Sequence, residues 1–273
     1  MVVHPRLVLL CVGALAHVVR CFLHFPAAAV AVNSPRHARC RSLEGRRRHV
    51  PAVINATRQQ PVPQNIFIVV LRDVQLDRAQ EVARALYKGG FRMMSITTHT
   101  KDFAAILRHV AGQDFPGLTI GASSVCSVQQ VDLAFACGAR FVSSTHCDVA
   151  VVRRTKKLGM ISIPGVSTPA QARGAVQAGG DIIKAFPSKD VSTECFRGIV
   201  ESVPSSVPVI ISGGVEVVQL EAYSASGASG FAVGRTLFEP EMTLAEIEAK
   251  ACCFISGGRQ IPWAPTLHAT DPA

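Results

Sequence analysis

Lys184 is the residue of this chain whose position best suits covalent chemistry. It is the one cation in the apolar run DIIKAFP, residues 181–187, which has strand character. Burial disfavours the charged form of a lysine and lowers its pKa. An ordinary lysine, with a pKa of about 10.4, is almost wholly protonated at pH 7, whereas a neutral one can attack a carbonyl carbon. Taken alone, such a lysine is more often a strand-end residue with its ammonium in water or paired with a carboxylate.

The elements that must position this lysine follow a regular pattern. Short apolar runs alternate with amphipathic helical stretches such as LDRAQEVARALYKGG, and several of these stretches end in glycine. The eight predicted strands are Ile66–Leu71, Arg92–Thr97, Leu118–Ala122, Phe141–Ser144, Ile161–Pro164, Ile182–Phe186, Val207–Ile211 and Gly230–Val233. This alternation predicts a single (β/α)8 TIM barrel. No G-x-G-x-x-G motif follows the first strand, which argues against a dinucleotide-binding fold.

Glycine-containing segments follow three of the predicted strands. IPGVSTP follows the fifth strand, ISGGV closes the seventh and AVGRTL closes the eighth, while Lys184 falls near the end of the sixth. Chemistry in such barrels lies at the carboxyl ends of the strands, and glycines that open helices after the last two strands indicate a phosphate site. Arg235 would add positive charge there. Tight turns between a strand and a helix also need glycine, so the motif has a purely structural explanation as well.

The net charge of +9 is concentrated in the first 60 residues. They contain nine arginines, no lysine and one acid, Glu44, for a charge of +8, which leaves +1 for residues 61–273. The nearly neutral remainder argues against a nucleic-acid-binding face.

Residues 1–60 have the composition of a targeting leader. Residues 7–19 are apolar but too short for a comfortable membrane span, and residues 33–60 are rich in arginine and serine, as transit peptides are. Small-residue cleavage signals occur at residues 14–16 and 29–31. We expect delivery to a plastid, with a mitochondrion or an uncleaved anchor as alternatives, and no membrane association after processing. The predicted organisation is a leader, 1–60, a barrel, 61–256, and an irregular tail, 257–273.

The nine cysteines do not indicate a metal site. Six of them lie after residue 60, without a C-x-x-C motif or a ligand spacing, and we expect reduced thiols.

Four segments together resemble a known family. IPGVSTPAQ, DIIKAFPS, ISGGV and AVGRTLF, in this order, resemble the 2-keto-3-deoxy-6-phosphogluconate (KDPG) and 4-hydroxy-2-oxoglutarate (KHG) aldolases, over about Val62 to Phe254. The resemblance implies a (β/α)8 barrel, usually a homotrimer. It also implies a Schiff-base lyase without metal or cofactor. Such an enzyme cleaves a 2-keto-3-deoxy sugar acid phosphate or 4-hydroxy-2-oxoglutarate to pyruvate and an aldehyde.

The resemblance also assigns roles to single residues. Lys184 stands at the position of the Schiff-base lysine. The implied phosphate-binding residues are Gly213, Gly214, Gly234, Arg235 and Thr236. The implied substrate-binding residues are Ser95, Thr97, Ser124, Pro164, Ser167, Phe186 and Ser212.

The second predicted strand departs from the family pattern. The family has a general acid/base glutamate in a segment like LEVTLRT, whereas this chain has MSITTHT, with Ser95 at the glutamate position and His99 at the arginine position. On the fourth strand, Thr145-His146 replaces the usual Pro-Gly. Serine does not ionise near neutral pH, but histidine does. Residues 95, 97 and 99 of one strand share a side, so His99 is the predicted catalytic acid/base, with His146 as a second candidate. Either histidine could instead form only a hydrogen bond at the rim.

Three hypotheses about function follow. The first is an aldolase in which Lys184 forms an imine with the pyruvate half, while a histidine or a water replaces the glutamate. The second is a catalytically impaired aldolase-fold protein that binds a phosphate ligand or acts as a scaffold. The third is another Schiff-base or phosphosugar enzyme on the same barrel. The retained lysine favours the first hypothesis and Ser95 favours the second.

Overall fold

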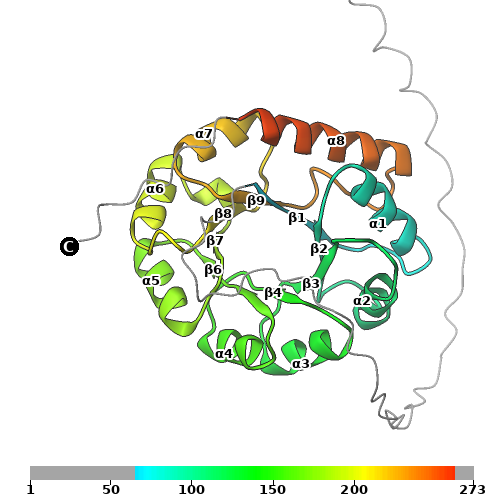
Figure 1. Cartoon of the computed structure of the whole chain (residues 1–273), viewed down its shortest axis with the longest axis horizontal. Coiled ribbons are helices and arrows are strands. Elements are labelled where there is room, and N and C mark those ends of the chain that lie inside the picture. Colours follow the sequence, from blue (N-terminus) through cyan, green and yellow to red (C-terminus); the bar gives the residue numbers. More distant parts are fainter. Residues whose placement is uncertain (1–64, 262–273) are drawn as a thin grey trace, which may run out of the picture. The chain divides into compact units, whose positions relative to one another are not determined.

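The computed structural model describes residues 65–261, in which parallel strands form a ring surrounded by helices (Figure 1). The predicted leader, 1–60, and the part of the predicted tail after residue 261 lie outside the described residues. The strands form one parallel sheet in the order β5-β4-β3-β2-β1-β9-β8-β7-β6. This arrangement agrees with the predicted (β/α)8 barrel.

The strands are short and mostly buried. Their bounds are β1 Ile66–Leu71, β2 Met93–Thr97, β3 Thr119–Ser123, β4 Phe141–Ser143, β5 Ile161–Ile163, β6 Gly165–Val166, β7 Ile183–Ala185, β8 Val209–Ser212 and β9 Gly230–Val233. The first and last of these have the predicted bounds, and β6 was not predicted. Each of the others differs from the prediction by one or two residues at one or both ends.

The helices lie outside the ring of strands. Their bounds are α1 Ala79–Lys88, α2 Phe103–Ala111, α3 Val128–Ala136, α4 Val149–Lys157, α5 Pro169–Ala178, α6 Thr193–Glu201, α7 Leu220–Ala225 and α8 Leu244–Gln260, with short 3-10 turns η1 Ser188–Asp190 and η2 Val217–Gln219. Helix α8 runs four residues into the segment predicted as tail. It begins with a capping box between Thr243 and Glu246. No helix in the described part of the chain combines the length and apolarity needed to cross a membrane.

The fifth predicted strand, Ile161–Pro164, ends as β5 at Ile163, and a short strand that was not predicted, β6, follows Pro164. Proline has no N–H to donate, so the regular ladder breaks there. The segment nevertheless accepts main-chain hydrogen bonds from both of its neighbours. Ser144 N, directly after β4, donates to Ile163 O at 3.2 Å, and Lys184 N of β7 donates to Pro164 O at 3.0 Å. The segment 161–166 therefore joins β4 to β7 and brings the two ends of the sheet together.

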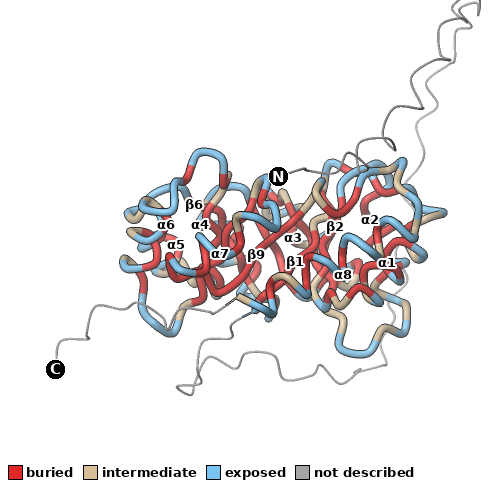
Figure 2. Tube along the Cα trace, turned by 90° about the horizontal axis from the view of Figure 1, so that it is seen from above, coloured by how far each residue is buried: buried red, intermediate tan, exposed pale blue. Residues whose placement is uncertain are grey.

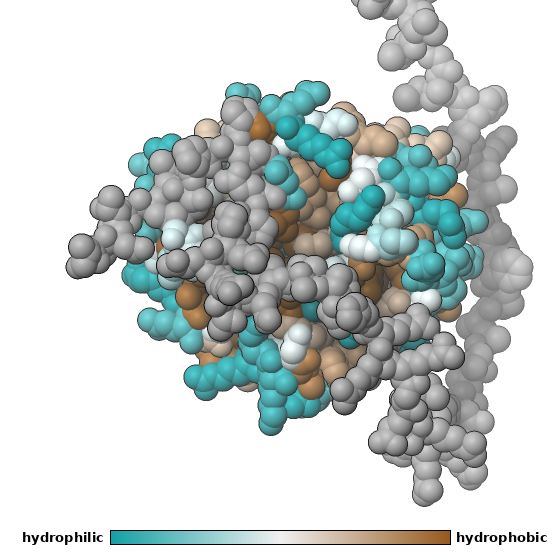
Figure 3. Space-filling view, in the orientation of Figure 1, coloured by the Kyte–Doolittle hydropathy of each residue, from teal (hydrophilic) through white to brown (hydrophobic). Residues whose placement is uncertain are grey.

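Two hydrophobic clusters fill the barrel. The larger joins residues of strands and helices, and the smaller consists almost entirely of strand residues. Figure 2 shows that the strands are buried along most of their length. The smaller one, the interior cluster, consists of Ile66, Ile68, Phe141, Ile163, Ile182, Ile210 and Ala232. Because side chains alternate along a strand, the residue two positions after each of these faces the interior again, one layer nearer the carboxyl end. In the face seen in Figure 3, hydrophilic residues dominate the outside and hydrophobic ones lie toward the centre.

Candidate active site

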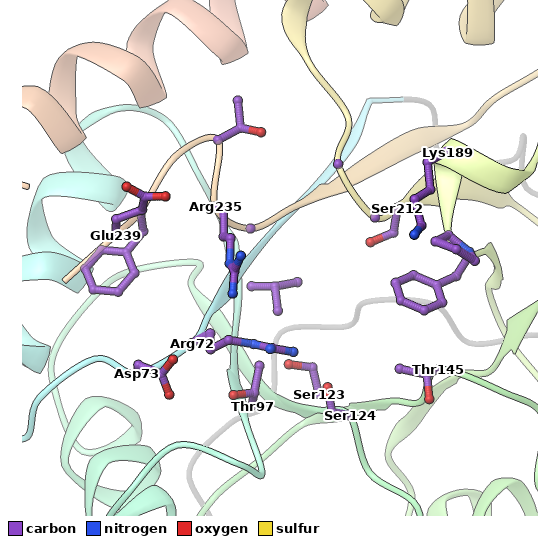
Figure 4. A pocket seen from close by; sticks show the side chains of 18 of the residues that line it. Arg72, Asp73, Thr97, Ser123, Ser124, Thr145, Lys189, Ser212, Arg235 and Glu239 are labelled. Atoms are coloured by element: carbon purple, nitrogen blue, oxygen red, sulfur yellow. The ribbon is translucent and has the colours of Figure 1, made fainter.

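A cavity of about 780 Å³ opens at the carboxyl ends of the strands. It is lined by Val70, Arg72, Asp73, Thr97, Ser123, Ser124, Thr145, Lys184, Phe186, Pro187, Lys189, Ser212, Gly213, Gly214, Gly234, Arg235, Thr236, Phe238, Glu239, Pro240 and Glu241. Arg72 and Arg235 extend into it from the ends of β1 and β9, with Thr97 and Ser123 below Arg72 in the view of Figure 4. Hydroxyl groups, four cations and the carboxylates of Asp73, Glu239 and Glu241 thus surround a space large enough for a small sugar acid.

Lys184 reaches this cavity because of its place on β7. Ile183 and Ala185 pack into the outer core, while Ile182 belongs to the interior cluster, so Lys184 faces the interior two residues further on. The residue is 6% exposed. Burial of the ammonium lowers the pKa of Lys184 from 10.5 to about 7. A substantial fraction of the amine is therefore neutral near pH 7 and able to act as a nucleophile.

Two groups contact the amine. Lys184 Nζ donates a hydrogen bond to Ser143 Oγ at 2.7 Å, and it lies 5.5 Å from the centroid of the Phe186 ring. Ser143 lies two residues after Phe141 of the interior cluster, so it faces the same interior as the lysine. The hydroxyl orients the amine, and the ring face adds a weak attraction for its charged form.

The loops after β8 and β9 are joined to each other and to the loop after β7. Thr236 Oγ1 donates to Val215 O at 3.1 Å, and Ser188 Oγ donates to Gly213 O at 2.8 Å. Gly213 and Gly214 have φ of 102° and 97°, a region that other residues rarely adopt. These glycines are therefore required by the turn itself. The turn also brings its backbone to the edge of the cavity beside Arg235 and Thr236.

Ten of the predicted site residues line this one cavity. They are Thr97, Ser124, Lys184, Phe186, Ser212, Gly213, Gly214, Gly234, Arg235 and Thr236. The lining does not include Ser95, His99, Pro164 or Ser167.

Two of the four lie on β2 or in the turn directly after it. The strand ends at Thr97, so the alternation that would place residue 99 beside residue 97 does not continue, and His99 is exposed in the following turn. Ser95 lies one layer deeper than Thr97. It is fully buried and donates to Val69 O at 3.4 Å. A catalytic role for His99 and a substrate contact by Ser95 stay predictions.

The fifth-strand residues have other surroundings. Pro164 is buried in the sheet, where its carbonyl accepts from Lys184 N. Ser167 is exposed and donates to Gln171 Oε1 at 3.0 Å. His146 is exposed beside Thr145, whose Oγ1 lies 3.4 Å from His146 Nδ1.

Sequence reasoning missed several residues of the site. Ser143, Ser123, Arg72 and Lys189 either line the cavity or contact its lysine. A signal was present for Arg72, a cation directly after the first strand, and for Ser143 and Ser123, which end strands on the same side as an interior residue. Among the residues that the structure describes, no group of three or more His, Cys, Asp or Glu side chains could hold a metal ion.

Comparison with known proteins settles the family. A family model described as KDPG and KHG aldolase matches residues 59–250. The chain belongs to the KDPG and KHG aldolase family. The resemblance predicted from the sequence motifs is therefore confirmed.

Two relatives of this aldolase-family chain illustrate the match. A probable 2-dehydro-3-deoxy-6-phosphogalactonate aldolase from Rhizobium meliloti (strain 1021) is 28% identical over 206 residues, which cover 73% of this chain and 97% of the relative. The native structure of KDPGal has a TM-score of 0.69 at 24% identity, covering 74% of this chain and 97% of that one.

A third comparison concerns a protein with a bound reaction intermediate. KDPG aldolase from Legionella pneumophila, with pyruvate captured at low pH as a covalent carbinolamine intermediate, has a TM-score of 0.61 at 22% identity. The match covers 73% of this chain and 95% of that one. The two solved structures support the barrel fold of this family member.

Proposed function

We propose that this protein is a Schiff-base aldolase that cleaves a 2-keto-3-deoxy sugar acid phosphate, or 4-hydroxy-2-oxoglutarate, to pyruvate and an aldehyde. Lys184 attacks the keto carbon, and loss of water gives an iminium ion. The iminium ion accepts the electron pair of the carbon–carbon bond as it breaks. Because residue 95 is serine, the proton of the substrate hydroxyl passes to an ordered water or to one of the histidines predicted from the sequence, His99 or His146.

The observation that carries this proposal is the state of Lys184. It combines 6% exposure, a pKa lowered to about 7 and a place in the wall of a cavity of about 780 Å³. A structural lysine at a strand end would extend its ammonium into water or pair with a carboxylate. Lys184 does neither, because its Nζ is turned inward to Ser143. Family membership and a carbinolamine of pyruvate in one structural relative support the same assignment.

The cations of the cavity suit an anionic substrate. Arg72, Lys189 and Arg235 line it together with the main chain of Gly213 and Gly214. Cationic side chains and free N–H groups of glycine turns bind phosphate and carboxylate groups. We assign the phosphate to the side of Gly213, Gly214 and Arg235, as the sequence motifs predicted.

Reductive trapping tests the proposal. The barrel domain is incubated with pyruvate and cyanoborohydride, and the adduct is located by peptide mass spectrometry. We expect one adduct, on Lys184, whose rate of formation rises with pH through about 7 as the amine loses its proton. Lys184→Met should abolish it. The control Lys157→Met, which removes an exposed lysine at the end of α4, should leave it unchanged. If incubation with pyruvate and cyanoborohydride gives no adduct on Lys184, the proposal is refuted.

Ser95 favours a second function, that of a catalytically impaired aldolase-fold protein that binds a phosphate ligand. The side chain at this position is fully buried and has no ionisable group. This function would be favoured if pyruvate is trapped on Lys184 but the protein does not cleave KDPG, its galactose-derived isomer or 4-hydroxy-2-oxoglutarate. Release of pyruvate from any of them would exclude it.

Plastid delivery and a homotrimeric assembly are proposals from the sequence and the family resemblance. Localisation of a fluorescent fusion of residues 1–60 tests the first, and light scattering of the purified barrel tests the second.

A further inference from the structure

The hydrogen bond between Lys184 and Ser143 joins two buried groups from distant parts of the chain. Nζ and Oγ are 2.7 Å apart, the residues are 41 positions apart, and Ser143 is 5% exposed. A hydroxyl is both a donor and an acceptor, and its hydrogen rotates to suit its partner. Ser143 Oγ can therefore accept from the amine while its own hydrogen points elsewhere.

Several other hydroxyls at this end of the barrel have partners that fix the loops. Thr98 Oγ1 donates to Ser124 O, Ser144 Oγ donates to His146 O, and Thr97 Oγ1 and Thr100 Oγ1 bond to each other at 2.9 Å. Thr236 and Ser188 donate to main-chain carbonyls, as described above. Ser143 differs from them because its partner is the nucleophile.

We propose that Ser143 relays the proton that must move from nitrogen to oxygen when Lys184 adds to the keto carbon. This inference rests on the proposed aldolase function. Attack of the neutral amine forms the carbon–nitrogen bond and leaves an ammonium next to an alkoxide. Ser143 Oγ takes one proton from this nitrogen and gives its own hydrogen to the alkoxide. The product is a neutral carbinolamine, and the serine ends as it began.

This relay needs no ionised serine, because one proton arrives as another leaves. That property separates it from the role of a carboxylate, which must hold the proton between steps. Ser95 has a different partner, because it is fully buried and its Oγ donates to Val69 O at 3.4 Å. The serine on β4 thus takes over one of the proton transfers that the family assigns to the residue-95 position on β2.

Single-turnover trapping with pyruvate and cyanoborohydride tests the relay in four proteins: wild type, Ser143→Ala, Ser143→Thr and Ser226→Ala. Ser226 is a control for the loss of a buried hydroxyl, because its Oγ donates to Ala222 O of α7 at 2.9 Å. We expect Ser143→Ala to slow adduct formation about 100-fold, the lower end of the effect of a positioned proton-transfer group. Ser143→Thr keeps the hydroxyl and should stay within about 10-fold of wild type, and Ser226→Ala should match wild type.

Chemical rescue separates a relay from a purely structural role. Added imidazole, a small proton donor and acceptor that the cavity can admit, should speed the reaction of Ser143→Ala and leave wild type unchanged. If Ser143→Ala forms the adduct at the wild-type rate, the relay is overturned and the aldolase proposal stays intact. If Ser143→Ala forms the adduct slowly and imidazole does not raise that rate, the relay is also overturned. An unlabelled wild type overturns both proposals.

Discussion

Replacing Lys184 by methionine should stabilise the folded protein, and the gain should depend on pH. Methionine has a similar length, no charge and a flexible side chain that suits the interior. The lysine is 6% exposed, and burial lowers its pKa from 10.5 to about 7. The folded state therefore carries the cost of a buried ammonium whenever the amine is protonated. The methionine variant does not carry this cost.

The size of the effect follows from the two pKa values. A lowering from 10.5 to about 7 corresponds to about 5 kcal/mol, at about 1.36 kcal/mol for each tenfold change in the dissociation constant. Below pH 7 the amine is protonated in both the folded and the unfolded protein, so the full cost applies. Between pH 7 and 10.5 the unfolded state binds more protons than the folded state. The unfolding free energy of the wild type therefore rises with pH relative to that of the variant.

Urea unfolding of both proteins from pH 6 to pH 10 measures this difference. The advantage of Lys184→Met should fall by about 4 kcal/mol over this range, with the steepest change between pH 7 and pH 10. Other titrating groups are common to both proteins, so their contributions cancel in the difference. A difference that stays constant within about 1 kcal/mol would show that Lys184 titrates as an exposed lysine does. A buried amine with a lowered pKa would then be excluded.

Three further predictions concern neighbouring positions. Ser95→Glu should raise the rate of substrate cleavage at least about 10-fold. It should also move the pH midpoint of trapping at Lys184 upward, which pH–rate profiles can show. An unchanged cleavage rate would show that another group transfers the proton. Ser123→Ala should raise the unfolding free energy by about 1 kcal/mol in urea melts, because Ser123 Oγ has no hydrogen-bond partner among the described residues; a loss of stability would reveal a missing partner. Gly213→Ala should cost about 1–3 kcal/mol of unfolding free energy, and more than Gly214→Ala. Both have positive φ, but only at 213 would a Cβ meet main chain, at 2.9 Å; equal costs would contradict this reasoning.

The barrel could be predicted from the sequence because each strand is a local apolar run bounded by turn residues. Ile66–Leu71 and Gly230–Val233 have the predicted bounds for this reason. The break between β5 and β6 at Pro164 is visible locally only as a missing N–H donor. Whether the chain on either side of the proline still joins β4 and β7 depends on closure of the whole ring. Closure is a property of the tertiary structure rather than of the segment.

The site was only partly predictable, for a similar reason. Lys184 could be identified because a cation in an apolar run is a local anomaly. Ser143 could not be paired with it, because the two strands are separated by β5 and β6 and by 41 residues of sequence. His99 was placed by an alternation that requires the strand to continue, and β2 ends two residues earlier, at Thr97. Prediction of side-chain direction is only as good as the prediction of where the strand ends.

In the proposed mechanism, serine in place of a carboxylate changes the nucleophile as well as the proton transfers. A carboxylate beside a lysine favours the charged amine and raises its pKa, whereas burial lowers it. In this chain burial is the cause that lowers the pKa of Lys184 to about 7, and its hydrogen-bond partner is an uncharged hydroxyl. The absence of a glutamate at position 95 thus removes a proton-transfer group and, at the same time, an anion that would hold the amine protonated. A neutral amine that is hydrogen-bonded to a hydroxyl needs a group that accepts one proton as it donates another. It does not need a carboxylate that holds a proton between steps. Ser143 has the contact and the chemistry to provide that relay.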